Sequence, residues 1–281
     1  MSAKHVLIFS ERPPPAPEVP TIGLSVRHAL MAEALAANGF EVTYAWPAGS
    51  NPDRTPFDRT APFATAEFSA ADELAEWIHR FAPHSVVLGY WELADWIPDR
   101  LGSSLVLDYI APRLLERQFE DRDRLTEEIP ALLKVLARCD EVWVGNCRQH
   151  DLMVSLMLLA GHDCRFDLPV RVVPIAGRVA DRVAAGENSG GPLKLFHGGR
   201  GWPWRDASAW LDVLRRQSGP WRLDGSEAGA LAGHGEYFER LRRADLALEL
   251  CAANVERRYS QSFRMTDALC AGVPVICNDF L

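Results

Sequence analysis

The 281-residue sequence lacks any hydrophobic run long enough to cross a membrane. Its longest mainly apolar stretch, 152–160, is far below the roughly 20 residues that a spanning helix needs. The apolar run near the N-terminus, 6–9, is also too short for the core of a signal peptide. We therefore expect a soluble, cytoplasmic protein, and peripheral contact with a membrane stays open.

The chain also lacks an excess of positive charge, since its formal net charge is −8. This balance disfavours nonspecific binding to nucleic acid. None of the six cysteines forms a C-x-x-C pair, and no pair of histidines has the spacing of zinc ligands. We expect reduced thiols and no metal site. With 48% hydrophobic and 24% charged residues, the composition is that of a globular protein of one large or two ordinary domains.

Neither the G-x-G-x-x-G pattern of dinucleotide sites nor the Lys-Ser/Thr ending of a P-loop comes after the strand expected over Leu193–His197. Instead, this strand leads into Gly198 and Gly199 and then into two arginines, Arg200 and Arg205. A helix with the apolar stripe Trp210, Leu211 and Leu214 comes next, with Asp206 expected to cap it. Glycines let the backbone approach a ligand closely, and helix N-termini and guanidinium groups both attract anions. The stretch is typical of a phosphate site, or else of a glycine-rich connection with surface arginines.

Alternating strands and helices fill the rest of the chain, which predicts an α/β protein with parallel sheets. The expected strands are 6–9, 41–46, 85–89, 105–108, 141–145, 170–174, 193–197, 221–223, 246–250 and 273–277, and the expected helices are 25–38, 70–81, 126–138, 148–160, 237–243 and 263–271.

A polar, glycine-rich segment separates two such series. We expect a first domain over 1–176, a linker over 177–192 and a second domain over 193–281.

A second polar constellation precedes the helix expected over 263–271, which Gly272 ends. Glu256, Ser262 and Arg264 stand before or at its N-terminus, where a phosphate or a sugar is favoured. The alternative is a solvated loop followed by an ordinary amphipathic helix.

Four residues of the first domain are candidates for a second ligand site. Gly23 precedes the first helix, and His28 lies within that helix, near a strand end. Asp108 and Asn146 stand at the ends of strands, where ligands collect in open α/β sheets.

Three stretches resemble GT-B glycosyltransferases of the GT4 type. Gly199 and Arg200, then four residues and Arg205, resemble the family's G-R-x4-K-G, with Arg in place of Lys. Residues 35–42, L-A-A-N-G-F-E-V, resemble the L-A-x-x-G-H-E-V that ends the first helix of its acceptor domains. Residues 267–275, D-A-L-C-A-G-V-P-V, resemble E-A-M-A-C-G-x-P-V, which places Asp267 at the second glutamate of the family's E-x7-E motif.

The resemblance implies two Rossmann-like domains facing a cleft and transfer of a sugar from a nucleotide diphosphate sugar to an acceptor hydroxyl. The resemblance also implies that the configuration at the anomeric carbon is retained and that neither a metal ion nor a cofactor is needed. Gly198, Gly199, Arg200, Arg205, Ser262 and Arg264 would hold the donor, and Asp267 its ribose. Gly23, Asp108 and Asn146 would stand on the acceptor side, where His28 could reach the acceptor hydroxyl. The first glutamate of the motif falls on Tyr259, so Glu256 is the available substitute, with His28 as the second catalytic candidate.

Two alternatives stay open: a non-catalytic relative that binds sugar nucleotides or partner proteins, and a GT-B-fold epimerase of nucleotide sugars. Family donor domains continue beyond the strand 273–277, so the second domain is expected to be incomplete. We expect that strand to be central in its sheet, with apolar surface around Val273, Val275 and Ile276 left exposed and self-association as the result.

Overall fold

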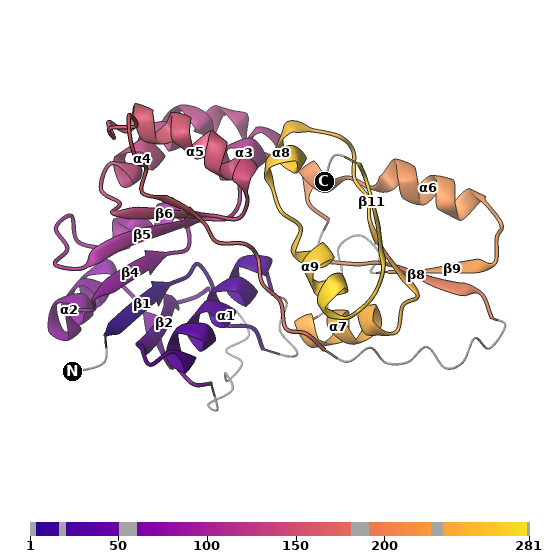
Figure 1. Cartoon of the computed structure of the whole chain (residues 1–281), viewed down its shortest axis with the longest axis horizontal. Coiled ribbons are helices and arrows are strands. Elements are labelled where there is room, and N and C mark those ends of the chain that lie inside the picture. The colour runs from indigo at the N-terminus through magenta and orange to yellow at the C-terminus, as the bar shows by residue number, and fades with distance from the viewer. Residues whose placement is uncertain are drawn as a thin grey trace. The chain divides into compact units, whose positions relative to one another are not determined.

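The chain forms two compact units, seen in a computed structural model that describes residues 4–16, 21–50, 61–180, 191–199, 201–225 and 233–279. Unit 1 comprises residues 1–15 and 22–174, and unit 2 comprises residues 16–21 and 175–281. Figure 1 colours most of unit 1 from indigo to magenta and most of unit 2 from orange to yellow. Most of the linker expected over 177–192 lies outside the described residues.

Unit 1 is built on a seven-stranded, entirely parallel sheet with the order β3-β2-β1-β4-β5-β6-β7. Its strands are β1 (His5–Phe9), β2 (Glu41–Pro47), β3 (Ala64–Phe68), β4 (Ser85–Leu88), β5 (Ser104–Tyr109), β6 (Glu141–Val144) and β7 (Val170–Val172). Its helices are α1 (Gly23–Ala37), α2 (Ala71–Phe81), α3 (Arg113–Glu120), α4 (Leu125–Leu136) and α5 (Cys147–Leu159), with 3-10 turns η1 (Trp91–Trp96) and η2 (Arg122–Arg124).

Strand alternation divides the core of unit 1 between the two faces of the sheet, because successive side chains point in opposite directions. Val6 and Ile8 of β1 pack with Ala29 and Ala32 of α1 on one face. Leu7 and Phe9 belong to the larger core on the other face, which α2, α4 and α5 cover. Both faces are therefore buried, as a parallel sheet requires.

Unit 2 is built on a four-stranded parallel sheet with the order β11-β10-β8-β9. Its strands are β8 (Leu193–His197), β9 (Trp221–Gly225), β10 (Leu246–Glu249) and β11 (Val275–Cys277). Its helices are α6 (Ser208–Arg216), α7 (His234–Arg242), α8 (Val255–Tyr259) and α9 (Phe263–Cys270), with the 3-10 turn η3 (Pro203–Arg205). Phe196 of β8, Leu241 of α7 and Ala268 of α9 share its core, whereas α6 buries no residue.

Each sheet contains a point at which the chain reverses the direction in which it adds strands. In unit 1 the chain runs outward from β1 to β3 and then resumes at β4, on the other side of β1. In unit 2 it runs from β8 to β9 and resumes at β10, on the other side of β8. The connections leave in opposite directions at these points, and the crevice between them at the carboxyl ends of the strands is where open α/β sheets bind ligands.

The expected α/β architecture is confirmed, but the position expected for the last strand is wrong. β11 lies at the edge of its sheet and pairs only with β10 among the described strands. Val273 precedes the strand and is only 1% exposed, so it is not part of an exposed patch. Ile276 is 47% exposed, as an outward-facing residue of an edge strand can be.

Local expectations differed from the structure at several other places. β3, α3 and α8 were not expected, because each is only five to eight residues long. Pro130 was expected in the first turn of the helix over 126–138, but it is the sixth residue of α4 and therefore removes one hydrogen bond inside the helix. Asp206 lies one residue before the N-cap position of α6, although its carboxylate accepts a hydrogen bond from the Ser208 N–H at 2.9 Å.

Among the described residues, no helix combines the length and the apolar character needed to cross a bilayer.

Candidate functional site

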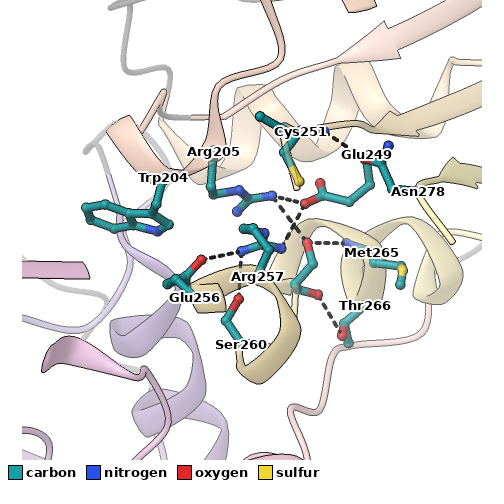
Figure 2. A network of polar contacts seen from close by, with 12 residues as sticks. Trp204, Arg205, Glu249, Cys251, Glu256, Arg257, Ser260, Met265, Thr266 and Asn278 are labelled. Carbon is teal, nitrogen blue, oxygen red and sulfur yellow. Dashed lines mark hydrogen bonds and ion pairs between the residues drawn. The ribbon is translucent and has the colours of Figure 1, made fainter. Parts of the chain in front are cut away.

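The switch point of unit 2 gathers residues from both sequence motifs. β8 ends at His197 and is followed by Gly198 and Gly199, while β10 ends at Glu249. Because these strands are neighbours and parallel, their carboxyl ends lie at the same edge of the sheet. Figure 2 shows the polar contacts that connect this edge with the residues before and within α9.

The glycine turn after β8 lies directly against Arg264 of α9. Gly199 has a φ of +89°, which L residues rarely adopt, and a β-carbon there would come within 2.6 Å of the Arg264 Nε. A β-carbon on Gly198 would come within 2.4 Å of the Phe196 ring. Both glycines are therefore required by the local geometry, and they let the Arg264 guanidinium approach the backbone closely.

Arg205 connects the loop after β8 to the end of β10. Its Nη2 atom donates to Glu249 Oε1 and also lies 3.4 Å from the hydroxyl of Ser262. Burial lowers the pKa of Arg205 to about 10, and the neighbouring charge of Arg264 adds to this, so the side chain stays a cation at neutral pH. Ser262 also caps α9, because its hydroxyl accepts a hydrogen bond from the Met265 N–H at 3.3 Å.

Glu249 is 2% exposed and stays ionised in this environment. Burial alone would raise its pKa, but the positive charges of Arg205, Arg264 and Arg257 outweigh burial and hold the pKa below its ordinary value. Its Oε1 atom lies 3.5 Å from Arg257 Nη2. Its Oε2 atom is buried and has no hydrogen-bond partner among the described residues.

Helix α8 supplies the third arginine and a second buried carboxyl group. Asn254 caps this helix by accepting from the Arg257 N–H at 3.0 Å, and its amide donates to the Trp204 carbonyl at 2.9 Å. Arg257 Nη1 donates to the Ser260 hydroxyl at 2.7 Å and lies 3.6 Å from Glu256 Oε2. Glu256 is 1% exposed, and burial raises its pKa despite the nearby arginine.

A small pocket of about 10 Å³ lies beside the carboxyl ends of β8 and β10. Glu249, Arg264 and Gly198 supply its polar part, and apolar side chains supply the rest. The apolar residues are Phe196, Tyr237, Leu241, Ala247, Leu248 and Val275. The pocket therefore has room for about one water-sized polar group beside Glu249 and Arg264.

Two histidines border this region. Burial, with the charge of Arg264 as the next cause, lowers the pKa of His197 to about 4, so its ring is neutral at pH 7. His234, at the start of α7, has its Nε2 atom 3.8 Å from a carboxylate oxygen of Asp267 on α9. The structure thus places Asp267 on the same helix as Arg264, one turn further along.

The switch point of unit 1 carries a separate polar network that is fully buried. The carboxylate of Asp108, at the end of β5, accepts hydrogen bonds from Arg27 Nε at 2.7 Å and from Arg27 Nη2 at 2.9 Å. Asp108 Oδ2 also lies 3.1 Å from His28 Nε2, and His28 Nδ1 lies 2.9 Å from the hydroxyl of Ser10. Burial alone would raise the pKa of Asp108, but the Arg27 charge and the hydrogen bonds from His28 and Arg27 hold it below its ordinary value.

Gly89 and Pro174 complete this network. A β-carbon on Gly89, which follows β4, would come within 2.4 Å of the His28 Cε1 atom. Arg27 Nη1 donates to the Pro174 carbonyl at 3.0 Å. The ends of β1, β4 and β5 are therefore joined by one buried ring of contacts around His28.

The remaining candidates from the sequence have local roles or lie outside the described residues. Gly23 is the first residue of α1, whose N-cap is Ile22. Asn146 caps α5 by accepting from the Gln149 N–H at 2.9 Å. Arg200 lies outside the described residues.

Sequence reasoning missed four residues of the two networks, namely Ser10, Arg27, Gly89 and Glu249. Ser10 directly follows an expected strand, Gly89 is the last residue of another, and Glu249 stands near the end of a third, so their position at the carboxyl edge was a usable signal. Arg27 carried no comparable signal, because charged residues on helices are usually solvated.

No group of three or more His, Cys, Asp or Glu side chains that could hold a metal ion occurs in the described ranges.

The fold is that of the GT-B glycosyltransferases. Among solved structures, sucrose-phosphate synthase from Thermosynechococcus elongatus is similar, with a TM-score of 0.66, 12% identity, and coverage of 98% of this chain and 81% of that one. An alpha-glucosyltransferase in complex with UDP has a TM-score of 0.58, 11% identity, and coverage of 98% and 80%. Arabidopsis thaliana UGT89C1 complexed with UDP-L-rhamnose has a TM-score of 0.56, 11% identity, and coverage of 99% and 78%. No protein-family model and no curated protein sequence matches the chain.

Proposed function

We propose that this chain transfers a sugar from a nucleotide diphosphate sugar to an acceptor hydroxyl. The observation that carries the proposal is the cluster of Arg205, Arg257 and Arg264 around Glu249 at the switch point of unit 2, with Arg264 also against the glycine turn. Guanidinium groups bind phosphate oxygens in a fixed fork geometry. The GT-B fold, shared with structures solved with UDP and UDP-L-rhamnose, supports the same donor class.

In the proposed reaction, the bond between the anomeric carbon and the diphosphate oxygen breaks, and a bond to the acceptor oxygen forms. The acceptor loses its proton to the departing diphosphate or to solvent. The arginines stabilise the negative charge that develops on the leaving group, which is the largest electrostatic demand of the step. We propose that this charge makes a metal ion unnecessary and that the product retains the configuration at the anomeric carbon, as the resemblance to GT4 enzymes implies.

Carboxylates and the acceptor side complete the assignment. Asp267 is proposed to bind the donor ribose, and Glu256, with its raised pKa, to contact the donor near the reacting carbon. His28 and Asp108, with Ser10, are proposed to form the floor of the acceptor site in unit 1. Both ring nitrogens of His28 already have partners, so proton transfer through it would need the acceptor hydroxyl to replace Ser10.

Replacing Arg205 with Ala tests the proposed phosphate contact. A hydrogen bond to a charged group contributes about 1.5–3 kcal/mol, so the affinity for nucleoside diphosphates should fall about tenfold or more. Affinity for the uncharged nucleoside should stay nearly unchanged. Arg215→Ala is the matched control, because its guanidinium lies on α6 and is 60% exposed. Equal losses for both ligands would show that the substitution disrupts the unit and would count against a phosphate contact.

A non-catalytic sugar-nucleotide binder is the second candidate. Tyr259 stands where the resemblance places the first glutamate of the E-x7-E motif, and a tyrosine cannot supply a carboxylate. Such a protein would bind nucleotide sugars through the same arginines without releasing nucleoside diphosphate. A GT-B-fold epimerase would instead return an isomer of the donor sugar, so product analysis separates the three activities.

A further inference from the structure

Glu249 has two carboxylate oxygens in different situations. Oε1 accepts from Arg205 and lies 3.5 Å from Arg257 Nη2. Oε2 is buried and accepts no hydrogen bond from any described residue. A buried carboxylate oxygen without a donor is costly unless a ligand supplies the donor. The side chain is 2% exposed and lines the pocket at the carboxyl edge of β8 and β10.

The surroundings of Oε2 restrict the kind of group that can donate to it. Arg205, Arg257 and Arg264 all lie close enough to hold Glu249 as an anion, so a second, ligand-borne cation would be repelled there. A neutral donor attached to an anionic group meets both requirements. The pocket beside Glu249 has a volume of about 10 Å³, which has room for one hydroxyl-sized group and not for a whole ring. A sugar hydroxyl next to a phosphate combines these features.

We propose that Glu249 is a specificity-determining residue whose Oε2 atom accepts a hydrogen bond from a hydroxyl of the bound nucleotide sugar. Its Oε1 atom at the same time orients Arg205 toward the diphosphate. This inference rests on the proposed function, because it needs a diphosphate held by the arginines. The hydroxyl belongs either to the ribose or to the transferred sugar, and these two sources share the same chemistry. The carboxylate oxygens of Glu256 are also buried without a hydrogen-bond partner among the described residues, but Glu256 forms an ion pair with Arg257 and does not line this pocket.

Glu249→Gln tests the assignment, with Glu239→Gln as the matched control, since Glu239 lies on α7 and its side chain is 48% exposed. The probes are inorganic pyrophosphate, the best-binding member of a set of uridine, guanosine, adenosine and cytidine diphosphates, its 2′,3′-dideoxy analogue, and its glucose ester. Dissociation constants are measured by calorimetry for the wild type and both variants.

The expected result is a selective loss. A hydrogen bond to a charged acceptor is stronger than one to an amide. Glu249→Gln should therefore lower the affinity for the hydroxyl-bearing ligand by about tenfold. Its affinity for pyrophosphate should not fall, since the substitution removes a negative charge beside three arginines. If the ribose is the source, the nucleoside diphosphate and its glucose ester both lose affinity and the dideoxy analogue does not. If the transferred sugar is the source, only the glucose ester loses affinity.

Uniform loss for every probe, or no loss for any of them, would overturn the assignment of Glu249. Failure of the wild type to bind both pyrophosphate and every nucleoside diphosphate would instead overturn the proposed function. If circular dichroism shows that Glu249→Gln does not fold, a crystal structure of the wild type with the glucose ester decides. A ligand hydroxyl within hydrogen-bonding distance of Oε2 supports the proposal, and a ligand that leaves Oε2 without a donor refutes it.

Discussion

Gly199→Ala should separate the backbone requirement of the glycine turn from its role at the candidate site. Gly199 has a φ of +89°, and a non-glycine residue in the left-handed region costs roughly 1–2 kcal/mol. The new β-carbon would also lie 2.6 Å from Arg264 Nε, so the guanidinium must move away. A displaced Arg264 would lose its proposed contact with a bound diphosphate, and a charge-assisted contact contributes about 1.5–3 kcal/mol.

Two quantities should therefore change in Gly199→Ala. The free energy of unfolding should fall by about 1–2 kcal/mol, measured by urea denaturation. The affinity for nucleoside diphosphates should fall about tenfold or more, measured by calorimetry. Gly161→Ala is the control, because Gly161 has a φ of +93° and no atom lies within 4 Å of the β-carbon position. This variant should lose similar stability and no affinity.

The outcome that refutes the reasoning is an unchanged affinity in Gly199→Ala despite the expected loss of stability. Arg264 would then not contact the diphosphate, and the close approach of its guanidinium to the glycine turn would be a packing feature only.

Two further predictions concern the buried network of unit 1. Gly89→Ala should lower the free energy of unfolding by about 1–3 kcal/mol, because its β-carbon would overlap the His28 ring. Gly102→Ala is the control and should have little effect, because the space around Gly102 is open. Thermal denaturation compares the two variants, and equal stability would contradict the packing around His28. Asp108→Asn leaves Arg27 buried without its anion and should cost about 3–5 kcal/mol at pH 7. Because the folded-state pKa of Asp108 lies below its ordinary value of about 3.9, this difference from the wild type should be fully present above about pH 4 and shrink as the pH falls further; a difference that already shrinks between pH 7 and pH 5 would contradict the assignment.

The α/β architecture and both motifs of unit 2 could be predicted from the sequence, because apolar strands and capped helices leave strong local patterns. Gly199 and Arg264 were both identified, although nothing local indicates that they touch. Their contact depends on the strand order, which places the end of β8 beside β10 and next to the start of α9. The edge position of β11 was missed for the same reason, since an apolar strand has the same sequence whether it is central or at an edge.

Partners of buried charges were the other part that the sequence could not supply. His28 and Asp108 were candidates individually, yet their pairing with Arg27 and Ser10 joins residues 81 and 18 positions apart. Glu249 follows three apolar strand residues, where a single acidic residue is indistinguishable from a solvated strand end until its burial is known.

The most direct test of the central claim is a turnover measurement on the intact chain with a panel of nucleotide diphosphate sugars and a mixture of hydroxyl acceptors. Release of nucleoside diphosphate and the mass of the glycosylated acceptor are recorded together. The account predicts that at least one donor yields both products without added metal, and that Arg205→Ala strongly reduces both while Arg215→Ala does not. Binding of a donor without release of nucleoside diphosphate would indicate a non-catalytic binder. The claim would be contradicted if no donor in the panel binds or reacts.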